Sequence, residues 1–154
     1  MSECAAGLNI GIYLFDEVEL LDFAGPCEVF TTAARVHARP EVMAWIASVA
    51  RGCRLVASVC TGAFLLAKAG LPDGLRVTTH RDDVAALQAD FPQVEVVSGP
   101  RWLDNGTRLT SAGISAGIDM SLHLVQRLAG REPALATARQ MGRDWRDADA
   151  REAP

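Results

Sequence analysis

Cys60 is the residue of this sequence with the strongest local case for chemistry. It stands in the stretch RLVASVCTGAFLLAKAG (residues 54–70), where an apolar, strand-like run breaks at the cysteine and restarts as a helix behind Thr61 and Gly62. A cysteine on such a bend lies at the carboxyl edge of a parallel sheet, where open α/β sheets bind ligands. The small residues after it permit the tight backbone of a nucleophile elbow. The sequence therefore predicts a nucleophilic thiol at Cys60, with a buried structural thiol as the alternative.

The helix that follows Cys60 supplies groups that stabilise negative charge. The N–H groups at its start have no partner inside the helix, and together with the helix dipole they favour a thiolate, which is the nucleophilic form of cysteine. The amides of Thr61 and Gly62 are placed by the same bend to bind a developing oxyanion. We therefore expect Thr61 and Gly62 to form the backbone part of the site.

Asp22 and His80 are the candidates for moving protons at the sulfur. Asp22 stands in LLDFAGP directly before a predicted helix, so it is either a helix-capping carboxylate or a partly buried acid close to the sulfur. His80 ends the run LRVTTH and is either a base at the same edge of the sheet or a structural group. The sequence leaves both alternatives open for each residue.

Alternating strands and helices must hold these residues in place. Apolar, β-prone runs predict strands at 8–15, 54–59, 75–80 and 93–98, and a hairpin over 101–112 with a type I′ turn at Asn105-Gly106. Apolar periodicity, together with Pro and Gly at the ends, predicts helices at 22–36, 40–52, 61–70, 81–91, 114–130 and 132–145. This order implies an α/β sandwich with a mostly parallel sheet. We expect one domain over residues 1–154, with a frayed tail at 146–154.

Other distinctive side chains are expected to be structural. Trp45, Trp102 and Trp145 are predicted to lie in the core or in an interface rather than in a stacking site. Asp119 is expected to cap or pair within the fold. His123, in the last long helix, is expected to be solvated.

The composition favours a cytoplasmic globular domain that binds neither nucleic acid nor membrane. The 154 residues are 49% hydrophobic, which is enough for one core, and the net charge of −4 comes with no basic block. No apolar run is long enough to span a bilayer, and the first residues lack the pattern of a secretory signal. None of the four cysteines belongs to a C-x-x-C pair or to a zinc-type cluster, so no metal is expected.

Three blocks of the sequence resemble the ThiJ/PfpI superfamily, which has a class I glutamine amidotransferase-like fold. They are GIYLFDEVELLDFAGPCEVF (11–30), ASVCTGAFLLAKAGLPDGLRVTTH (57–80) and LDNGTRLTSAGISAGIDMSLHLVQRLAG (103–130). Within the superfamily they are similar to the isonitrile hydratase branch and to the sensor domains of AraC-type regulators. The resemblance implies a flavodoxin-like three-layer α/β/α sandwich and a homodimer. It also implies Cys60 as nucleophile, Asp22 as its acid partner, Thr61 facing the site, and no metal or organic cofactor.

The resemblance implies one enzymatic function and leaves two alternatives. In isonitrile hydratases the thiolate adds to the terminal carbon of a small isocyanide, and water releases an N-substituted formamide from the thioimidate. The first alternative is a non-catalytic, ligand-sensing member of the family. Such a regulator carries a helix-turn-helix domain after its sensor domain, and none occurs in these residues, so a stand-alone protein is expected. The second alternative is a redox-responsive cysteine protein.

The sequence departs from the resemblance between its first predicted helix and Cys60. Relatives carry further strands there, one of which ends in a PGG-type loop that supplies an amide to the oxyanion site. Here EVFTTAARV passes directly to HARPEVMAWIASVARG. We therefore expect strands to be missing relative to the family, and the loss of one oxyanion donor costs about 2.7–4 kcal/mol of transition-state stabilisation. In addition, Arg81 follows His80 where relatives often have tryptophan.

Overall fold

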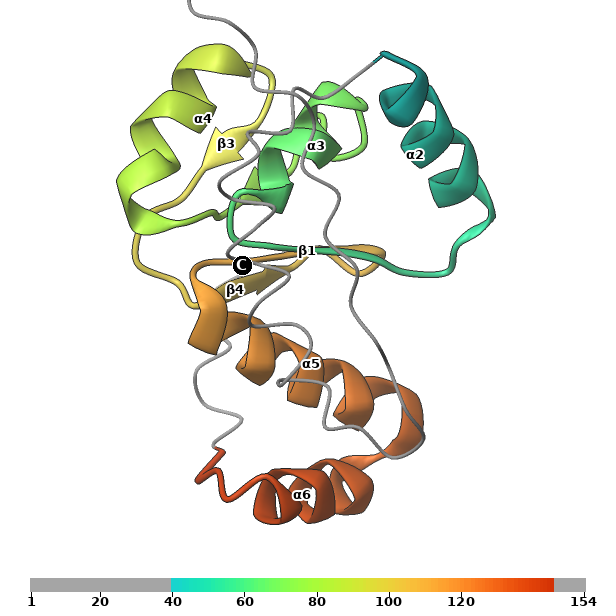
Figure 1. The fold of residues 1–154 in the computed structure, drawn as a ribbon, viewed down its shortest axis with the longest axis vertical. Helices are drawn as coiled ribbons and strands as arrows, with labels where there is room; N and C mark the ends of the chain where they lie inside the picture. Colours follow the sequence, from blue (N-terminus) through green and yellow to red (C-terminus); the bar gives the residue numbers. More distant parts are fainter. Residues whose placement is uncertain (1–39, 146–154) are drawn as a thin grey trace, which may run out of the picture. The chain divides into compact units, whose positions relative to one another are not determined.

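The structure, a computed structural model, describes residues 40–145, in which strands and helices alternate (Figure 1). The helices are α2 (Pro40–Gly52), α3 (Gly62–Lys68), α4 (Val84–Asp90), α5 (Ile114–Ala129) and α6 (Arg131–Gln140), with a short 3-10 helix, η1 (Arg81–Asp83), before α4. The strands are β1 (Val56–Val59), β2 (Arg76–Val77), β3 (Glu95–Val96), β4 (Trp102–Asp104) and β5 (Arg108–Ser111). The predicted segments before residue 40, which include Asp22, and those after residue 145 lie outside the described residues.

The described strands form one three-stranded sheet and one two-stranded sheet. In the first, in the order β1-β5-β4, β1 runs parallel to β5 with Val56 opposite Arg108 and Val59 opposite Ser111. The hairpin β4–β5 is antiparallel. The second sheet pairs β2 and β3 in parallel. The parallel pairs agree with the predicted α/β fold, and the hairpin adds one antiparallel strand to it.

Two side chains join β2 to β5 across the gap between the sheets. The N–H of Thr78 donates to Oγ1 of Thr110 at 2.9 Å, and Nδ2 of Asn105 donates to the carbonyl of Arg76 at 2.9 Å. These bonds occupy backbone groups of the β2 segment that a regular ladder would pair with backbone. As a result, the ends of β2 and β5 lie close together.

Helices α3 and α5 cover opposite faces of β1. A Cβ added at Gly62, in α3, would meet Cβ of Ser58 at 3.4 Å, whereas a Cβ added at Gly117, in α5, would meet Cγ1 of Val59 at only 2.7 Å. Because successive residues of a strand point to opposite faces, one helix packs on each side of β1. This is the expected three-layer arrangement of helix, sheet and helix (Figure 1).

Gly117 is required by the close approach of α5 to β1, and its replacement gives a testable result. We expect Gly117→Ala to lower the free energy of unfolding by about 1 kcal/mol, because the clash with the stiff Val59 side chain outweighs the better helix propensity of alanine. In a Val59→Ala background the same replacement should instead stabilise, by about 0.5–1 kcal/mol. Urea unfolding of the four proteins measures both values. Equal effects in the two backgrounds would contradict the packing described here.

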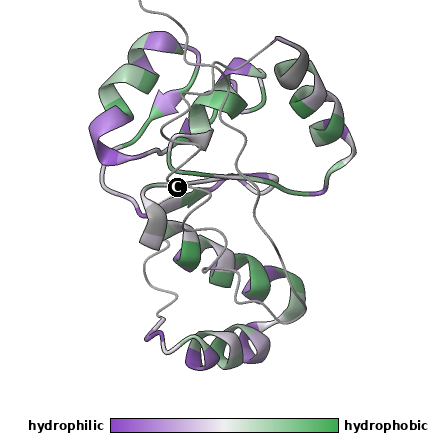
Figure 2. Ribbon diagram, viewed as in Figure 1, coloured by the Kyte–Doolittle hydropathy of each residue, from purple (hydrophilic) through white to green (hydrophobic). Residues whose placement is uncertain are grey.

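Three groups of buried apolar residues hold the elements together. The first joins α3, α4, β2 and the start of β3, and its members are Ala63, Ala67, Val77, Leu87 and Val94. The second joins the hairpin to α5 through Trp102, Leu109 and Met120, and the third joins α5 to α6 and Trp145 through Leu122, Ala134 and Ala138. Figure 2 shows apolar residues, in green, recurring along α5 between more polar ones, as in an amphipathic helix. No helix between residues 40 and 145 is long and apolar enough to cross a membrane.

Two predicted details are wrong. The hairpin turn lies one residue later than predicted, because Gly106 has a positive φ of 83° whereas Asn105 does not, and the N–H of Asn105 donates to the carbonyl of Arg108 at 2.9 Å. The last helix ends at Gln140 rather than at Trp145. Of the three tryptophans predicted to lie in the core or in an interface, Trp102 and Trp145 are buried in the core, whereas Trp45 is 64% exposed, which leaves an interface as the prediction for that residue.

Candidate functional site at the Cys60 elbow

Cys60 has a strained backbone. Its φ is +56°, and it is the one residue other than glycine with positive φ among residues 40–145. The left-handed conformation costs an L-amino acid roughly 1–2 kcal/mol, and such strain is kept where surrounding structure enforces it, often at functional sites. The strand before it ends at Val59 and α3 begins at Gly62, so the whole reversal is made by Cys60 and Thr61. The structure thus has the tight strand-to-helix bend predicted from the sequence, whereas the role of Cys60 as a nucleophile stays a prediction.

Hydrogen bonds from two neighbouring segments hold the Cys60 backbone. Its N–H is shared between the carbonyls of Ser111, at 3.0 Å, and Ala112, at 2.9 Å, which lie at the end of β5. Its carbonyl accepts from Oγ1 of Thr79 at 2.9 Å and from the N–H of Ala63 at 3.3 Å. Both sides of the strained residue are therefore fixed by groups at the carboxyl ends of β2 and β5.

Thr61 and Gly62, the predicted backbone part of the site, follow the half-buried Cys60 at the start of α3. Within residues 40–145 neither the N–H of Thr61 nor that of Gly62 donates to an acceptor, so both match the role of anion-binding amides. Thr61 is exposed, and its side chain forms no capping hydrogen bond to α3. Helix α3 has only seven residues, and the anion-binding role of these two N–H groups stays a prediction.

His80 lies at the same edge of the fold, three residues after β2. Its Nδ1 accepts a long hydrogen bond of 3.4 Å from the N–H of Asp82 and is 3.5 Å from Oδ2 of Asp83, both residues of η1. Its ring is also close to Gly113, where an added Cβ would meet Cδ2 at 3.6 Å. Because Gly113 directly follows Ala112, a partner of Cys60, His80 is near the elbow. No hydrogen bond joins His80 to Cys60 in the described part of the chain.

Thr79 is a residue of the site that the sequence analysis missed. It is 1% exposed, and its hydroxyl is bonded to the carbonyl of Cys60, nineteen positions away in the sequence. The available signal was the pair Thr78-Thr79 at the end of an apolar strand, since a buried hydroxyl requires a partner. The sequence does not show which group that partner is. Asp22, the predicted acid, lies outside the described residues, so its distance to the sulfur is a prediction.

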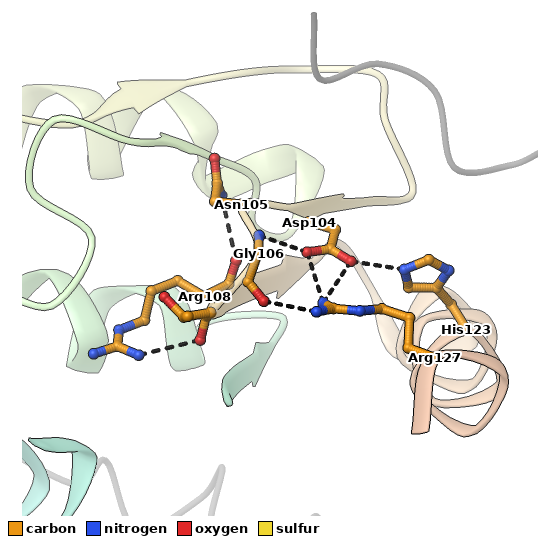
Figure 3. A network of polar contacts seen from close by, with 7 residues as sticks. Asp104, Asn105, Gly106, Arg108, His123 and Arg127 are labelled. Carbon is orange, nitrogen blue, oxygen red and sulfur yellow. Dashed lines mark hydrogen bonds and ion pairs between the residues drawn. The ribbon is translucent and has the colours of Figure 1, made fainter. Parts of the chain in front are cut away.

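A second polar cluster links the hairpin to α5 (Figure 3). No hydrogen bond joins it to Cys60 within the described residues. Oδ2 of Asp104 is 2.8 Å from Nε2 of His123 and 2.8 Å from Nη1 of Arg127, while Oδ1 accepts from the N–H of Gly106 at 2.7 Å. His123, with 15% of its side chain exposed, packs against Trp102. The prediction of a solvated His123 is therefore wrong, because this histidine is paired and largely buried.

A third cluster surrounds the buried Asp119 of α5. Its Oδ2 accepts from Nε of Arg101 at 2.8 Å and is also bonded to Nη2 of that residue, while Arg143 donates from Nε to Oδ1 at 2.7 Å. The segments before β4 and after α6 are thus tied to α5. The predicted structural role of Asp119 is confirmed. No three His, Cys, Asp or Glu side chains in residues 40–145 are placed to hold a metal ion.

The carboxylates of Asp104 and Asp119 both have a pKa below the ordinary value, although burial acts in the opposite direction. Burial raises the pKa of Asp104, but the hydrogen bonds from His123 and Gly106 and the charge of Arg127 outweigh it. Burial likewise raises the pKa of Asp119, and the hydrogen bonds from Arg143 and Arg101 outweigh it. In each case the pKa in the folded protein lies below its ordinary value.

These lowered pKa values predict a loss of stability in acid. A carboxylate whose pKa falls on folding contributes stability above its unfolded pKa of about 3.9, and this contribution is lost as the pH falls through the folded pKa. The free energy of unfolding by urea should therefore fall below about pH 4. Asp104→Asn should make this fall shallower. An unchanged slope in that variant would contradict the assignment.

Comparison with known proteins relates this geometry to a family. The model of the DJ-1/PfpI family matches residues 30–127. The HTH-type transcriptional regulator GbdR of Pseudomonas aeruginosa is 40% identical over 96 residues, which cover 62% of this chain and 26% of the regulator. The isonitrile hydratase of Pseudomonas putida is 28% identical over 175 residues, covering 82% of this chain and 75% of the hydratase. A solved ThiJ/PfpI family protein from Pseudomonas syringae has a TM-score of 0.63 at 27% identity, over 76% of this chain and 45% of that one.

The lengths of these matches bear on the expected deletion. The chain spans about a quarter of the regulator's length, 26%. The hydratase alignment runs over 175 positions but uses 82% of 154 residues, about 126, so about 49 positions of the alignment have no residue here. This difference agrees with the missing segment inferred from the sequence.

Proposed function

The chain belongs to the DJ-1/PfpI family, and from this premise we propose that it is a small-molecule-binding domain whose ligand lies against Cys60. The observation that carries the proposal is the strained Cys60 elbow, with its φ of +56° and a half-buried side chain, at the edge where the parallel strands end. Ligands of open α/β sheets bind at that edge. The backbone N–H groups of Thr61 and Gly62 would bind a negatively charged or carbonyl-type group of the ligand.

Binding without turnover is the function favoured for this site. The identity to the regulator GbdR, 40%, is higher than the identity to the isonitrile hydratase, 28%. The sequence resemblance to sensor domains of AraC-type regulators points in the same direction. In such a domain Cys60 contacts the ligand, and Thr61 and Gly62 orient it. A homodimer, expected from the family resemblance, is part of this proposal and is tested by light scattering after size exclusion.

Protection of Cys60 from alkylation tests this proposal. A panel of small polar metabolites is first screened for compounds that raise the melting temperature. Iodoacetamide labelling of each cysteine is then followed by mass spectrometry. At a concentration 100 times its Kd, a bound compound stabilises the fold by about 2.7 kcal/mol, and its 99% occupancy should slow labelling of Cys60 about a hundredfold. The exposed Cys53 is the internal control and should be unaffected. Stabilising compounds that leave Cys60 labelling unchanged would place the ligand elsewhere.

Isonitrile hydration is the second candidate, favoured by the elbow geometry of Cys60 and by the hydratase match over 82% of this chain. In that reaction the Cys60 thiolate adds to the isocyanide carbon, a proton goes to that carbon, and water then replaces the sulfur to release the formamide. Asp22 is the proposed proton carrier. Incubation with a simple alkyl isocyanide separates the two functions. Many equivalents of formamide, lost in Cys60→Ser, would establish turnover, whereas at most one equivalent per protein favours binding alone.

A further inference from the structure

Thr79 places its hydroxyl on the carbonyl of the one strained residue in the described chain that is not glycine. The residue is 1% exposed, and its Oγ1 donates to the Cys60 carbonyl at 2.9 Å. Buried hydroxyl groups are nearly always paired. The partner of Thr79 is the backbone carbonyl of Cys60.

The Thr79 bond completes the restraint on the Cys60 backbone. On one side, the N–H of Cys60 is held by the carbonyls of Ser111 and Ala112. On the other side, the only further donor to its carbonyl within residues 40–145 is the N–H of Ala63, at the longer distance of 3.3 Å. A left-handed residue other than glycine persists only when its surroundings over-determine it. The short bond from Thr79 is therefore the stronger of the two restraints on that side.

We infer that Thr79 is a positioning residue for Cys60: its hydroxyl keeps the elbow left-handed and so sets the place of the thiol at the ligand edge. The hydrogen bond from Thr79 to the Cys60 carbonyl is part of the structure, whereas a role of Thr79 in ligand binding rests on the proposed function. As a positioning residue, Thr79 does not contact the ligand. It acts through the backbone of Cys60.

Thr78 provides a matched control for Thr79. It is the preceding residue, it is also 1% exposed, and it bonds through its backbone N–H to Thr110 rather than to Cys60. Thr78→Val and Thr79→Val therefore each remove one hydroxyl group from a residue of equal burial. Thr79→Ser keeps the hydroxyl and removes only a methyl group.

The experiment compares the labelling rates of Cys60 and Cys53 by iodoacetamide in the wild type and in these three variants. Loss of one hydrogen bond shifts an equilibrium about fivefold, so the ratio of the Cys60 rate to the Cys53 rate should fall about fivefold or more in Thr79→Val. It should stay near the wild-type value in Thr79→Ser and Thr78→Val. In protein labelled with ¹³C-cysteine, the Cα signal of Cys60 should move in Thr79→Val alone, since this signal reports the backbone angles.

Each outcome decides the inference. A folded Thr79→Val protein with the wild-type rate ratio and an unmoved Cα signal would overturn it, as would equal effects in Thr78→Val. If Thr79→Val fails to fold, Thr79→Ala and the wild-type behaviour of Thr79→Ser take its place in the comparison. The proposed function fails separately, when stabilising compounds do not protect Cys60 in the wild-type protein.

Discussion

Replacing Asp119 by alanine is expected to lower the free energy of unfolding by about 3 kcal/mol. Asp119 is buried and holds the guanidinium groups of Arg101 and Arg143, so its removal takes away the carboxylate that these two positive charges share. Breaking a buried ion pair on one side costs about 3–5 kcal/mol, and the lower end applies because the side chains of Arg101 and Arg143 are 37% and 30% exposed and regain water. Urea unfolding followed by circular dichroism measures the loss.

Asp104→Ala is the matched control for this prediction. Asp104 also contacts two cationic or ionisable partners, but 21% of its side chain is exposed, against 5% for Asp119. We expect this control to cost about 1–2 kcal/mol, which is less than the Asp119 variant. A loss in Asp119→Ala no larger than in the control would show that the Asp119 cluster is a surface feature, contrary to the structure.

Replacing Cys60 by glycine is expected to give a more stable fold than replacing it by alanine, and both replacements remove the thiol. At a φ of +56°, glycine avoids the clash of a Cβ, so Cys60→Gly should be more stable than Cys60→Ala by about 1 kcal/mol. Both variants lack the sulfur, and under the second candidate function, isonitrile hydration, formamide formation should fall by at least about a hundredfold in each. The strain at the elbow is then a stability cost retained for the thiol.

Cys60→Ala is the control for the sulfur, and an alanine-to-glycine comparison at Ala63 is the control for the backbone. Ala63 lies within α3, where glycine should destabilise by about 1 kcal/mol. Opposite signs at positions 60 and 63 are expected. If glycine destabilised both positions equally, the left-handed elbow would be rejected.

The sequence was sufficient where local chemistry decides the structure. Helix α2 begins at Pro40 and ends at Gly52 as predicted, because proline suits a first turn and glycine ends a helix. The Cys60 elbow was also predictable, since small residues directly after an apolar strand permit the tight reversal. These features depend on neighbours in the chain.

Contacts between distant segments were not predictable. The bond between Thr79 and Cys60, the pairing of His123 with Asp104 and the position of the hairpin turn all depend on which segments lie side by side. In the observed turn, the side-chain Nδ2 of Asn105 donates to the carbonyl of Arg76, a contact with a segment 29 positions away. No periodicity in the sequence contains that information.

The expected deletion lies between the first predicted helix and Cys60, partly outside the described residues. Strand β1 has β5 on one side, and within residues 40–145 no strand pairs with its other side. Unpaired strand edges invite pairing with another segment or chain.

The rate of alkylation of Cys60 relative to Cys53 in the wild-type protein tests the central claim most directly. Cys53 is exposed and Cys60 is half-buried, so exposure alone would make Cys53 the faster residue. We predict that Cys60 reacts with iodoacetamide about tenfold faster or more, because the strained elbow places it beside the N–H groups of Thr61 and Gly62, which donate to no acceptor within residues 40–145. A Cys60 that reacts no faster than Cys53 would contradict the assignment of this elbow as the functional centre.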